Sequence, residues 1–377
     1  MGSQDEYERC VDAAFSEFRQ YDQISDIVSA WEQFLSDLIG TDDLYFDRFP
    51  AHPETTDNPA NTPTFTASMA ESYGIVFKIL QDVPSNFSAF SQQILYLTDL
   101  DRDNLVDEGP SPDQYDLCLI IASDQGQQAR MHINEFLDQS ELDENLVPLE
   151  FSYIDQDTNP KYRFERMTLV GDNFRDEGLP ERARMSPHLS SSTGELESIE
   201  IGATDFDRNK ATGILCNEEP PHLYLACHMW DRVFYDQLDD AQKIIWERED
   251  PSKTLEFEIE VDDLTTKLNR DYIPNGSVKS DWVDDTLEYL CVVESAKKIT
   301  GNRYRIDFRN LREKRREYRD VSVRGGEFSD LAKLFAEWHC ENTIEMDRGE
   351  LSELRTPDEE HEVENAEDWT QPEIGEF

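Results

Sequence analysis

A dense group of cations lies late in this chain. Between Lys297 and Arg324 there are eleven basic residues and four acids, a difference of +7. Like charges packed this closely repel one another unless an anion lies between them. Phosphate is an anion that arginine binds through paired hydrogen bonds. The segment therefore predicts a nucleic-acid-binding surface.

The expected contacts fall on three consecutive elements. A helix over 311–319 would place four arginines on one face, at spacings of three and four residues. Before it, a β-hairpin with strands at 292–296 and 303–308, turning at 300–302, would put Arg303 and Arg305 opposite Lys297 and Lys298. Lys279 and Trp282 would open the preceding helix. The candidate nucleic-acid-binding residues are Lys279, Trp282, Lys297, Lys298, Arg303, Arg305, Arg309, Arg312, Arg315, Arg316 and Arg319.

A competing interpretation keeps these charges within the protein. Glu313, Glu317 and Asp320, together with the acidic remainder, could neutralise the arginines in an internal interface. The segment would then serve protein interaction, with an acidic partner or a second copy of the chain. High salt favours this alternative, because it weakens attraction to phosphate steeply.

The rest of the composition is strongly acidic. The chain has 83 Asp and Glu against 35 Lys and Arg, a net charge of −48. Such self-repulsion opposes compaction in ordinary buffer, whereas at molar salt the screening length falls to about 3 Å. The composition resembles that of haloarchaeal proteins and predicts a salt-rich cytoplasm. An acidic nucleic-acid mimic or a chaperone is the alternative.

A run of strand and helix patterns occupies the first half. Thr62-Pro63-Thr64 leads into a strand at 65–67, followed by a strand at 73–80, a helix over 85–99 with Ser85 as its N-cap, and a buried strand at 115–122. Residues 44–155 resemble the core of the PD-(D/E)XK nuclease superfamily. The resemblance implies a metal-binding Asp on one strand and an acid and a Lys on the next, which hold Mg²⁺ and activate water.

This chain departs from the family pattern at each catalytic position. Thr64 stands at the metal-binding Asp, Lys78 at the second acid and Leu80 at the catalytic Lys. The resemblance therefore implies a degenerate, inactive site without metal or cofactor. An active Mg²⁺-dependent endonuclease would need relocated acids, for which Glu54, Asp57 and Glu71 are the candidates.

The six cysteines include no C-x-x-C pair, and several lie in apolar runs, so we expect reduced, buried thiols. Cys216, His222, Cys227 and His228 are ligand types that Zn²⁺ prefers, yet their spacing matches no familiar zinc motif. Buried cysteines and a histidine near a helix start are the alternative, and the sequence leaves both open.

The fold expected is α/β, with a mixed sheet flanked by helices in the manner of restriction endonucleases, then a smaller α+β unit. Two helices followed by a hairpin is the order of a winged helix. No stretch approaches the ~18 apolar residues of a membrane span, and a cytoplasmic protein is expected. The expected divisions are two N-terminal helices in 1–43, the nuclease-like domain at 44–170, a connection at 171–221, the winged-helix-like domain at 222–340 and a disordered acidic tail at 341–377.

Overall fold

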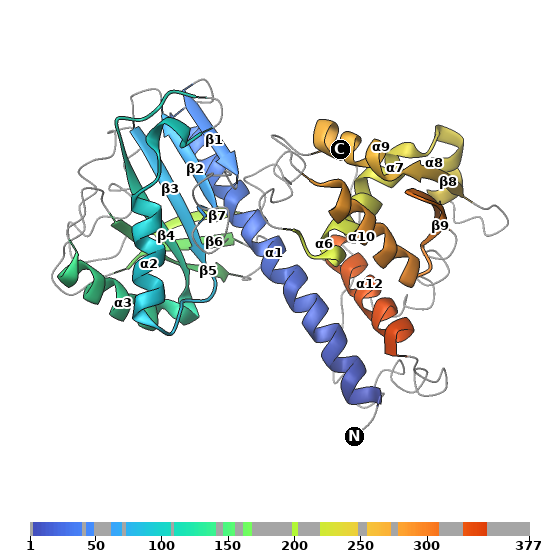
Figure 1. Cartoon of the computed structure of the whole chain (residues 1–377), viewed down its shortest axis with the longest axis horizontal. Helices are drawn as coiled ribbons and strands as arrows, with labels where there is room; N and C mark the ends of the chain where they lie inside the picture. The colour runs from blue at the N-terminus through green and yellow to red at the C-terminus, as the bar shows by residue number, and fades with distance from the viewer. Residues whose placement is uncertain are drawn as a thin grey trace, which may run out of the picture.

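The computed structural model forms two units joined by one long helix (Figure 1). A seven-stranded sheet with its helices makes the first unit, and a largely helical unit with a three-stranded sheet makes the second. The structure describes residues 3–39, 43–48, 62–69, 73–106, 109–140, 146–154, 161–167, 198–202, 219–247, 255–272, 278–308 and 327–344.

The large sheet follows chain order from β1 to β7. The pairs β3–β4 and β4–β5 are parallel and the other four are antiparallel. The expected α/β class with a mixed sheet flanked by helices is confirmed. The strands are β1 (Leu44–Arg48), β2 (Phe65–Met69), β3 (Tyr73–Leu80), β4 (Gln114–Ala122), β5 (Leu146–Ile154), β6 (Lys161–Arg166) and β7 (Ser198–Gly202).

Helices cover both faces of this sheet. α2 (Phe87–Thr98) and α3 (Gly126–Gln139) pack on one face, and α1 (Ser3–Ile39) packs on the other. The central strand β4 contributes side chains to the hydrophobic cores on both faces of the sheet, because successive side chains of a strand point to opposite faces. Asn86 caps α2 by accepting from the Ser88 amide at 2.9 Å, so the expectation of a Ser85 cap was wrong. Short 3₁₀ turns, η2 (Arg102–Asn104) and η3 (Ser123–Gln125), flank β4.

α1 is one continuous helix of 37 residues, where the sequence predicted two. The stretch between its two apolar halves contains no proline or glycine, and Tyr21 continues the buried stripe. Tyr21 packs on Tyr224 of the second unit at 4.6 Å between ring centroids, and Trp31 packs on Phe77 of β3 at 5.3 Å. α1 therefore contributes to the core of both units.

The second unit surrounds a three-stranded antiparallel sheet in the order β8-β10-β9. α10 contacts α6, α9 and α12, and α12 also lies along α1 (Figure 1). The elements of the second unit are α6 (His222–His228), the π-helix η4 (Met229–Phe234), α7 (Tyr235–Gln237), α8 (Asp240–Glu247), β8 (Glu256–Glu260), α9 (Val261–Lys267), the π-helix η5 (Leu268–Tyr272), α10 (Ser280–Val292), β9 (Ala296–Thr300), β10 (Arg303–Asp307) and α12 (Glu327–Ile344).

The β9–β10 hairpin turns where the sequence predicted. Gly301 adopts a φ of 55°, a left-handed conformation that glycine reaches without a Cβ penalty. The first strand, however, was expected at 292–296 and begins instead at Ala296, because α10 continues through Val292. Arg305 lies opposite Lys297, as expected, whereas Lys298 lies opposite Tyr304 and Arg303 lies opposite Thr300.

Two expected divisions need correction. β7 belongs to the large sheet although it lies within the segment assigned to the connection, and α12 extends to Ile344, into the segment assigned to the tail. The expected tail beyond 344 and most of 171–221 lie outside the described residues. Among the helices that are described, none combines the length and apolar character needed to cross a bilayer.

Candidate nucleic-acid interface

The three-stranded sheet turns one charged face outward. We call this the outer face, formed by alternate residues of its strands: Glu256, Glu258, Glu260, Lys297, Arg303, Arg305 and Asp307. The opposite face buries Tyr304 and Ile306 in the core. The alternation follows from the two-residue period of a strand and explains why the arginines of β10 point outward together.

Carboxylates of β8 pair with both arginines. Arg303 lies 2.9 Å from Glu258 and 3.3 Å from Glu260, and Arg305 lies 3.1 Å from Glu258 and 3.8 Å from Glu256. The guanidinium side chains remain 44% and 45% exposed. Exposed pairs of this kind each contribute at most about 1 kcal/mol, so an incoming phosphate could compete with them.

The outer face carries a small excess of negative charge, with four carboxylates against three cations. Lys297 is exposed and forms no ion pair with a described residue. Sequence reasoning missed the three glutamates as partners, because β8 lies far from β10 in the chain and only the pairing register brings them together.

Lys298 points away from the outer face toward α10. Its ammonium donates to Glu288 at 2.8 Å and lies 5.1 Å from the centroid of the Tyr304 ring. The hydrogen bond to Glu288 raises the pKa of Lys298 above its ordinary value. Tyr304 donates to Asp284 at 2.7 Å. Burial is the main cause that raises the pKa of Tyr304 to about 12; Lys298 opposes the shift and the hydrogen bond to Asp284 adds to it. Lys298 therefore joins the hairpin to α10.

The start of α10 does not offer the contacts expected. Trp282 is 6% exposed and belongs to the core, so its predicted role as a nucleic-acid contact is corrected. Lys279 precedes α10 and is exposed, with its ammonium 4.9 Å from the Trp282 ring centroid. The exposed side of α10 carries Asp281, Asp285 and Glu288, a surface that repels phosphate.

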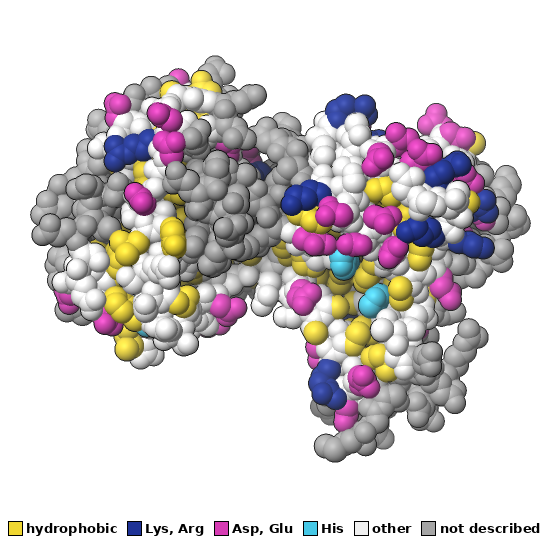
Figure 2. Space-filling model, viewed as in Figure 1, with side chains coloured by type: hydrophobic (Ala, Val, Ile, Leu, Met, Phe, Trp, Pro, Cys, Tyr) yellow, Lys and Arg dark blue, Asp and Glu magenta, His cyan; other side chains and the backbone are white. Residues whose placement is uncertain are grey.

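Arg309, Arg312, Arg315, Arg316 and Arg319 lie outside the described residues, as does the expected helix over 311–319. Within the described part of the second unit, cations and carboxylates are interspersed on the face that Figure 2 shows, without a continuous basic surface. On that face the described residues therefore offer no excess of positive charge, whereas the sequence places one in the segment that follows β10.

Two of the three positions singled out by the nuclease resemblance, Thr64 and Lys78, form a buried polar patch where β2 and β3 meet. The Thr64 hydroxyl accepts from the Ile79 amide at 3.0 Å, and the Lys78 ammonium donates to the Thr62 carbonyl at 2.7 Å. Lys78 is 9% exposed and Leu80 lies in the core beside α2. A hydroxyl, an ammonium and an aliphatic side chain thus stand at the three positions where the nuclease resemblance expects two carboxylates and a lysine.

One carboxylate shares the sheet face of this patch. Asp47 of β1 pairs in register with Thr66, which lies on the same face as Thr64, and Asp47 is 6% exposed. Sequence reasoning missed Asp47, because β1 is short and was not predicted. Within the described ranges, no group of three carboxylates could hold a metal ion together, and Glu54, Asp57 and Glu71 fall outside those ranges.

The candidate zinc ligands do not gather at one place. Cys227 and His228 are buried in the core of the second unit, whereas His222 is exposed at the start of α6 and stacks on Tyr289. Cys216 lies outside the described residues. For Cys227 and His228, the alternative of core residues is the one that the structure supports.

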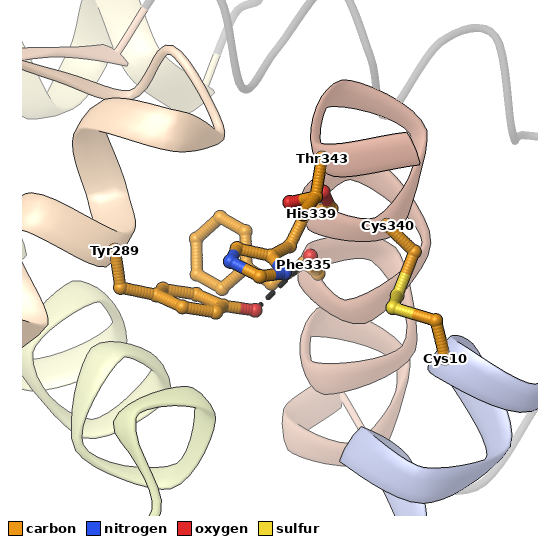
Figure 3. Close-up of a disulfide and its surroundings, with 6 residues drawn as sticks. All are labelled: Cys10, Tyr289, Phe335, His339, Cys340 and Thr343. Atoms are coloured by element: carbon orange, nitrogen blue, oxygen red, sulfur yellow. Dashed lines mark hydrogen bonds between the residues drawn. A yellow bond between two sulfur atoms is a disulfide. The ribbon is translucent and has the colours of Figure 1, made fainter. Parts of the chain in front are cut away.

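Two of the six cysteines form a disulfide, which corrects the expectation of reduced, buried thiols throughout. Cys10 of α1 bonds to Cys340 of α12, across 330 residues of sequence (Figure 3). Cys118 and Cys227 are buried as thiols, and burial raises the pKa of the half-buried Cys291 thiol. Beside the disulfide, burial and the nearby His222 lower the pKa of His339.

No protein-family model, curated protein or solved structure matches this chain.

Proposed function

We propose that this chain is a non-catalytic nucleic-acid-binding protein whose ligand is DNA. The observation that carries the proposal is the order of elements around the basic segment. Two helices, α9 and α10, precede the β9–β10 hairpin, which is the order expected of a winged helix, and the cation-rich run continues directly from that hairpin.

The hairpin and the segment after it would contact the phosphate backbone. The acidic exposed side of α10 argues against its insertion into a groove, because each carboxylate there would face phosphate. On the hairpin, Arg303 and Arg305 would exchange Glu258 for phosphate oxygens. Arg309, Arg312, Arg315, Arg316 and Arg319 would add the excess charge that the outer face lacks.

The first unit would be a degenerate relative of the PD-(D/E)XK nucleases that serves as a scaffold. The strand, strand, helix, strand order of β2, β3, α2 and β4 supports this, since the resemblance expects that order over the same residues. The loss of both carboxylates at Thr64 and Lys78 supports a unit without catalysis. The acid excess supports a salt-rich cytoplasm as the setting, and assays belong in molar KCl.

Binding tests this proposal directly. Fluorescence anisotropy with labelled duplex DNA, single-stranded DNA and RNA should show tightest binding to duplex. Arg303→Glu/Arg305→Glu should weaken it at least tenfold, because each reversal adds repulsion at a phosphate contact. Arg130→Glu/Arg163→Glu is the matched control, since these arginines of the first unit are similarly exposed; Arg130 pairs with one glutamate and Arg163 with two. Equal losses of DNA affinity in the two double variants would contradict a specific interface on the hairpin.

The absence of catalysis has its own test. Supercoiled plasmid incubated with the protein and Mg²⁺ or Mn²⁺ in molar KCl should stay intact. Cleavage that Asp57→Asn or Glu71→Gln abolishes would instead establish the alternative of a nuclease with relocated acids.

A second candidate, protein interaction, is favoured by the paired state of the outer face. Arg303 and Arg305 already hold carboxylates of β8, as they would hold those of an acidic partner. The acidic residues after 344 could be that partner within the chain. Deleting 345–377 would then expose a site that captures an added acidic peptide, while affinity for DNA would stay at background. If the full-length chain and the 345–377 deletion variant capture the acidic peptide equally well, this candidate is wrong.

A further inference from the structure

Three potential metal ligands meet at the junction of α1 and α12. Cys10 comes from the first helix of the chain, and His339 and Cys340 come from the last described helix. The two sulfur atoms and a ring nitrogen of His339 all lie within 4.8 Å of one another. Figure 3 shows the histidine ring beside the disulfide that joins the two helices.

The surrounding side chains hold the histidine in place. Tyr289 of α10 stacks on the His339 ring, with 4.5 Å between ring centroids and 12° between ring planes. The Tyr289 hydroxyl in turn donates to the Phe335 carbonyl of α12 at 3.1 Å (Figure 3). Partners that fix the orientation of a ligating imidazole are typical of metal centres.

We propose that Cys10, His339 and Cys340, once the disulfide is reduced, bind one Zn²⁺ ion. Two thiolates and one imidazole form a donor set that Zn²⁺ prefers, and three protein ligands commonly leave the fourth position to water. Disulfides are rare in reducing cytoplasm, so the thiol form is the one that such a compartment would hold. The proposal is independent of DNA binding.

The geometry accommodates both chemical states. The Cα atoms of Cys10 and Cys340 are 5.9 Å apart. With zinc–sulfur bonds of about 2.3 Å in a tetrahedral site, the sulfurs would lie about 3.8 Å apart, which side-chain rotation can reach. A dithiol reductant supplies two electrons and two protons to the disulfide and itself becomes a disulfide. Zn²⁺ then displaces the two thiol protons.

The consequence concerns how the two ends of the fold are joined. α1 contributes to the cores of both units, and its N-terminal half lies along α12. A disulfide would join α1 to α12 under oxidising conditions, and a metal ion would join them under reducing conditions. The reduced, metal-free chain would have neither link.

Cobalt binding tests this site in the full-length protein. The chain is reduced with a dithiol, desalted without oxygen into molar KCl and titrated with Co²⁺, whose bonds to thiolate give a charge-transfer absorption. We expect one Co²⁺ per chain, displaced by Zn²⁺. Cys10→Ser and Cys340→Ser should abolish the band, and His339→Asn should weaken Co²⁺ binding by more than the roughly 10-fold to 100-fold that an outer-shell partner is worth.

Two controls make the result decisive. Cys291→Ser removes a half-buried thiol outside the cluster and should leave the band unchanged. The oxidised parent keeps its fold and should give no band, so loss of signal there cannot come from unfolding. No band in the reduced parent, a band in the oxidised parent, or a band that survives the Cys10→Ser/Cys340→Ser double variant would each overturn the proposal.

Discussion

Reducing the Cys10–Cys340 disulfide in the presence of a metal chelator should destabilise this protein substantially. The bond joins the first described helix to the last one, and the closed loop spans almost the whole chain. Reduction of the disulfide releases the unfolded chain from that constraint. The unfolded state then gains conformational entropy, whereas the folded state, in which the helices stay packed, does not. We expect α1 and α12 to separate at lower denaturant than in the oxidised protein.

The size of the effect follows from the length of the loop. For a sequence separation of 330 residues, the loop-closure relation gives about 6 kcal/mol at 25 °C. Measured effects of disulfides are usually about 2–4 kcal/mol, because unfolded chains retain some structure. The free energy of unfolding should therefore fall by about 2 to 6 kcal/mol on reduction.

Urea unfolding in molar KCl, followed by tryptophan fluorescence, measures this difference. The comparison is between oxidised parent and parent held in reductant and chelator. A Cys10→Ala/Cys340→Ala variant serves as the control, and the reductant should leave its midpoint unchanged. The reasoning fails if the parent loses less than about 1 kcal/mol, below the usual disulfide range, or if the reductant shifts the control as much as the parent.

Three further changes have defined outcomes. At the lowest KCl concentration that keeps the protein folded, Glu258→Gln should tighten DNA binding by roughly fivefold, since about 1 kcal/mol of competing attraction is lost; anisotropy compares it with the matched Glu200→Gln, which should bind like the parent. Tyr304 should ionise only near pH 12 in an ultraviolet titration. Folding raises the pKa of Tyr304 from about 10, so the stability that this residue contributes is complete below pH 10 and is lost as pH rises from 10 to 12. Gly74→Ala should cost about 1–3 kcal/mol in urea unfolding, because the added Cβ would lie 2.6 Å from Leu105; unchanged stability would refute that packing.

Local patterns in the sequence predicted the centre of the first unit well. The strand at 73–80 is β3, and the run at 115–122 is β4 to within one residue, because long apolar runs bounded by turn residues have few other solutions. β1, β6 and β7 were not predicted. Each is short, and β7 pairs with β6 across a long stretch of intervening chain, so only the completed sheet determines its place.

The candidate interface was predictable in part. The outward alternation of Arg303 and Arg305 follows from strand geometry, as does the pairing of Arg305 with Lys297 across the turn at Gly301. The ion pairs to Glu258 depend on a register between distant strands, which no local pattern encodes. The bond between Cys10 and Cys340 is hidden for the same reason, since nothing near either cysteine indicates a partner at the opposite end of the chain.

The salt dependence of DNA binding tests the central proposal most directly. For duplex DNA, the logarithm of the binding constant should fall linearly with the logarithm of KCl concentration, by about 0.9 for each phosphate contacted. Changing Arg312, Arg315, Arg316 and Arg319 to Ala should reduce that slope by about 3 to 4, in proportion to the contacts removed. An unchanged slope in this variant, or no salt-dependent binding by the parent, would contradict a phosphate-binding role for the basic segment.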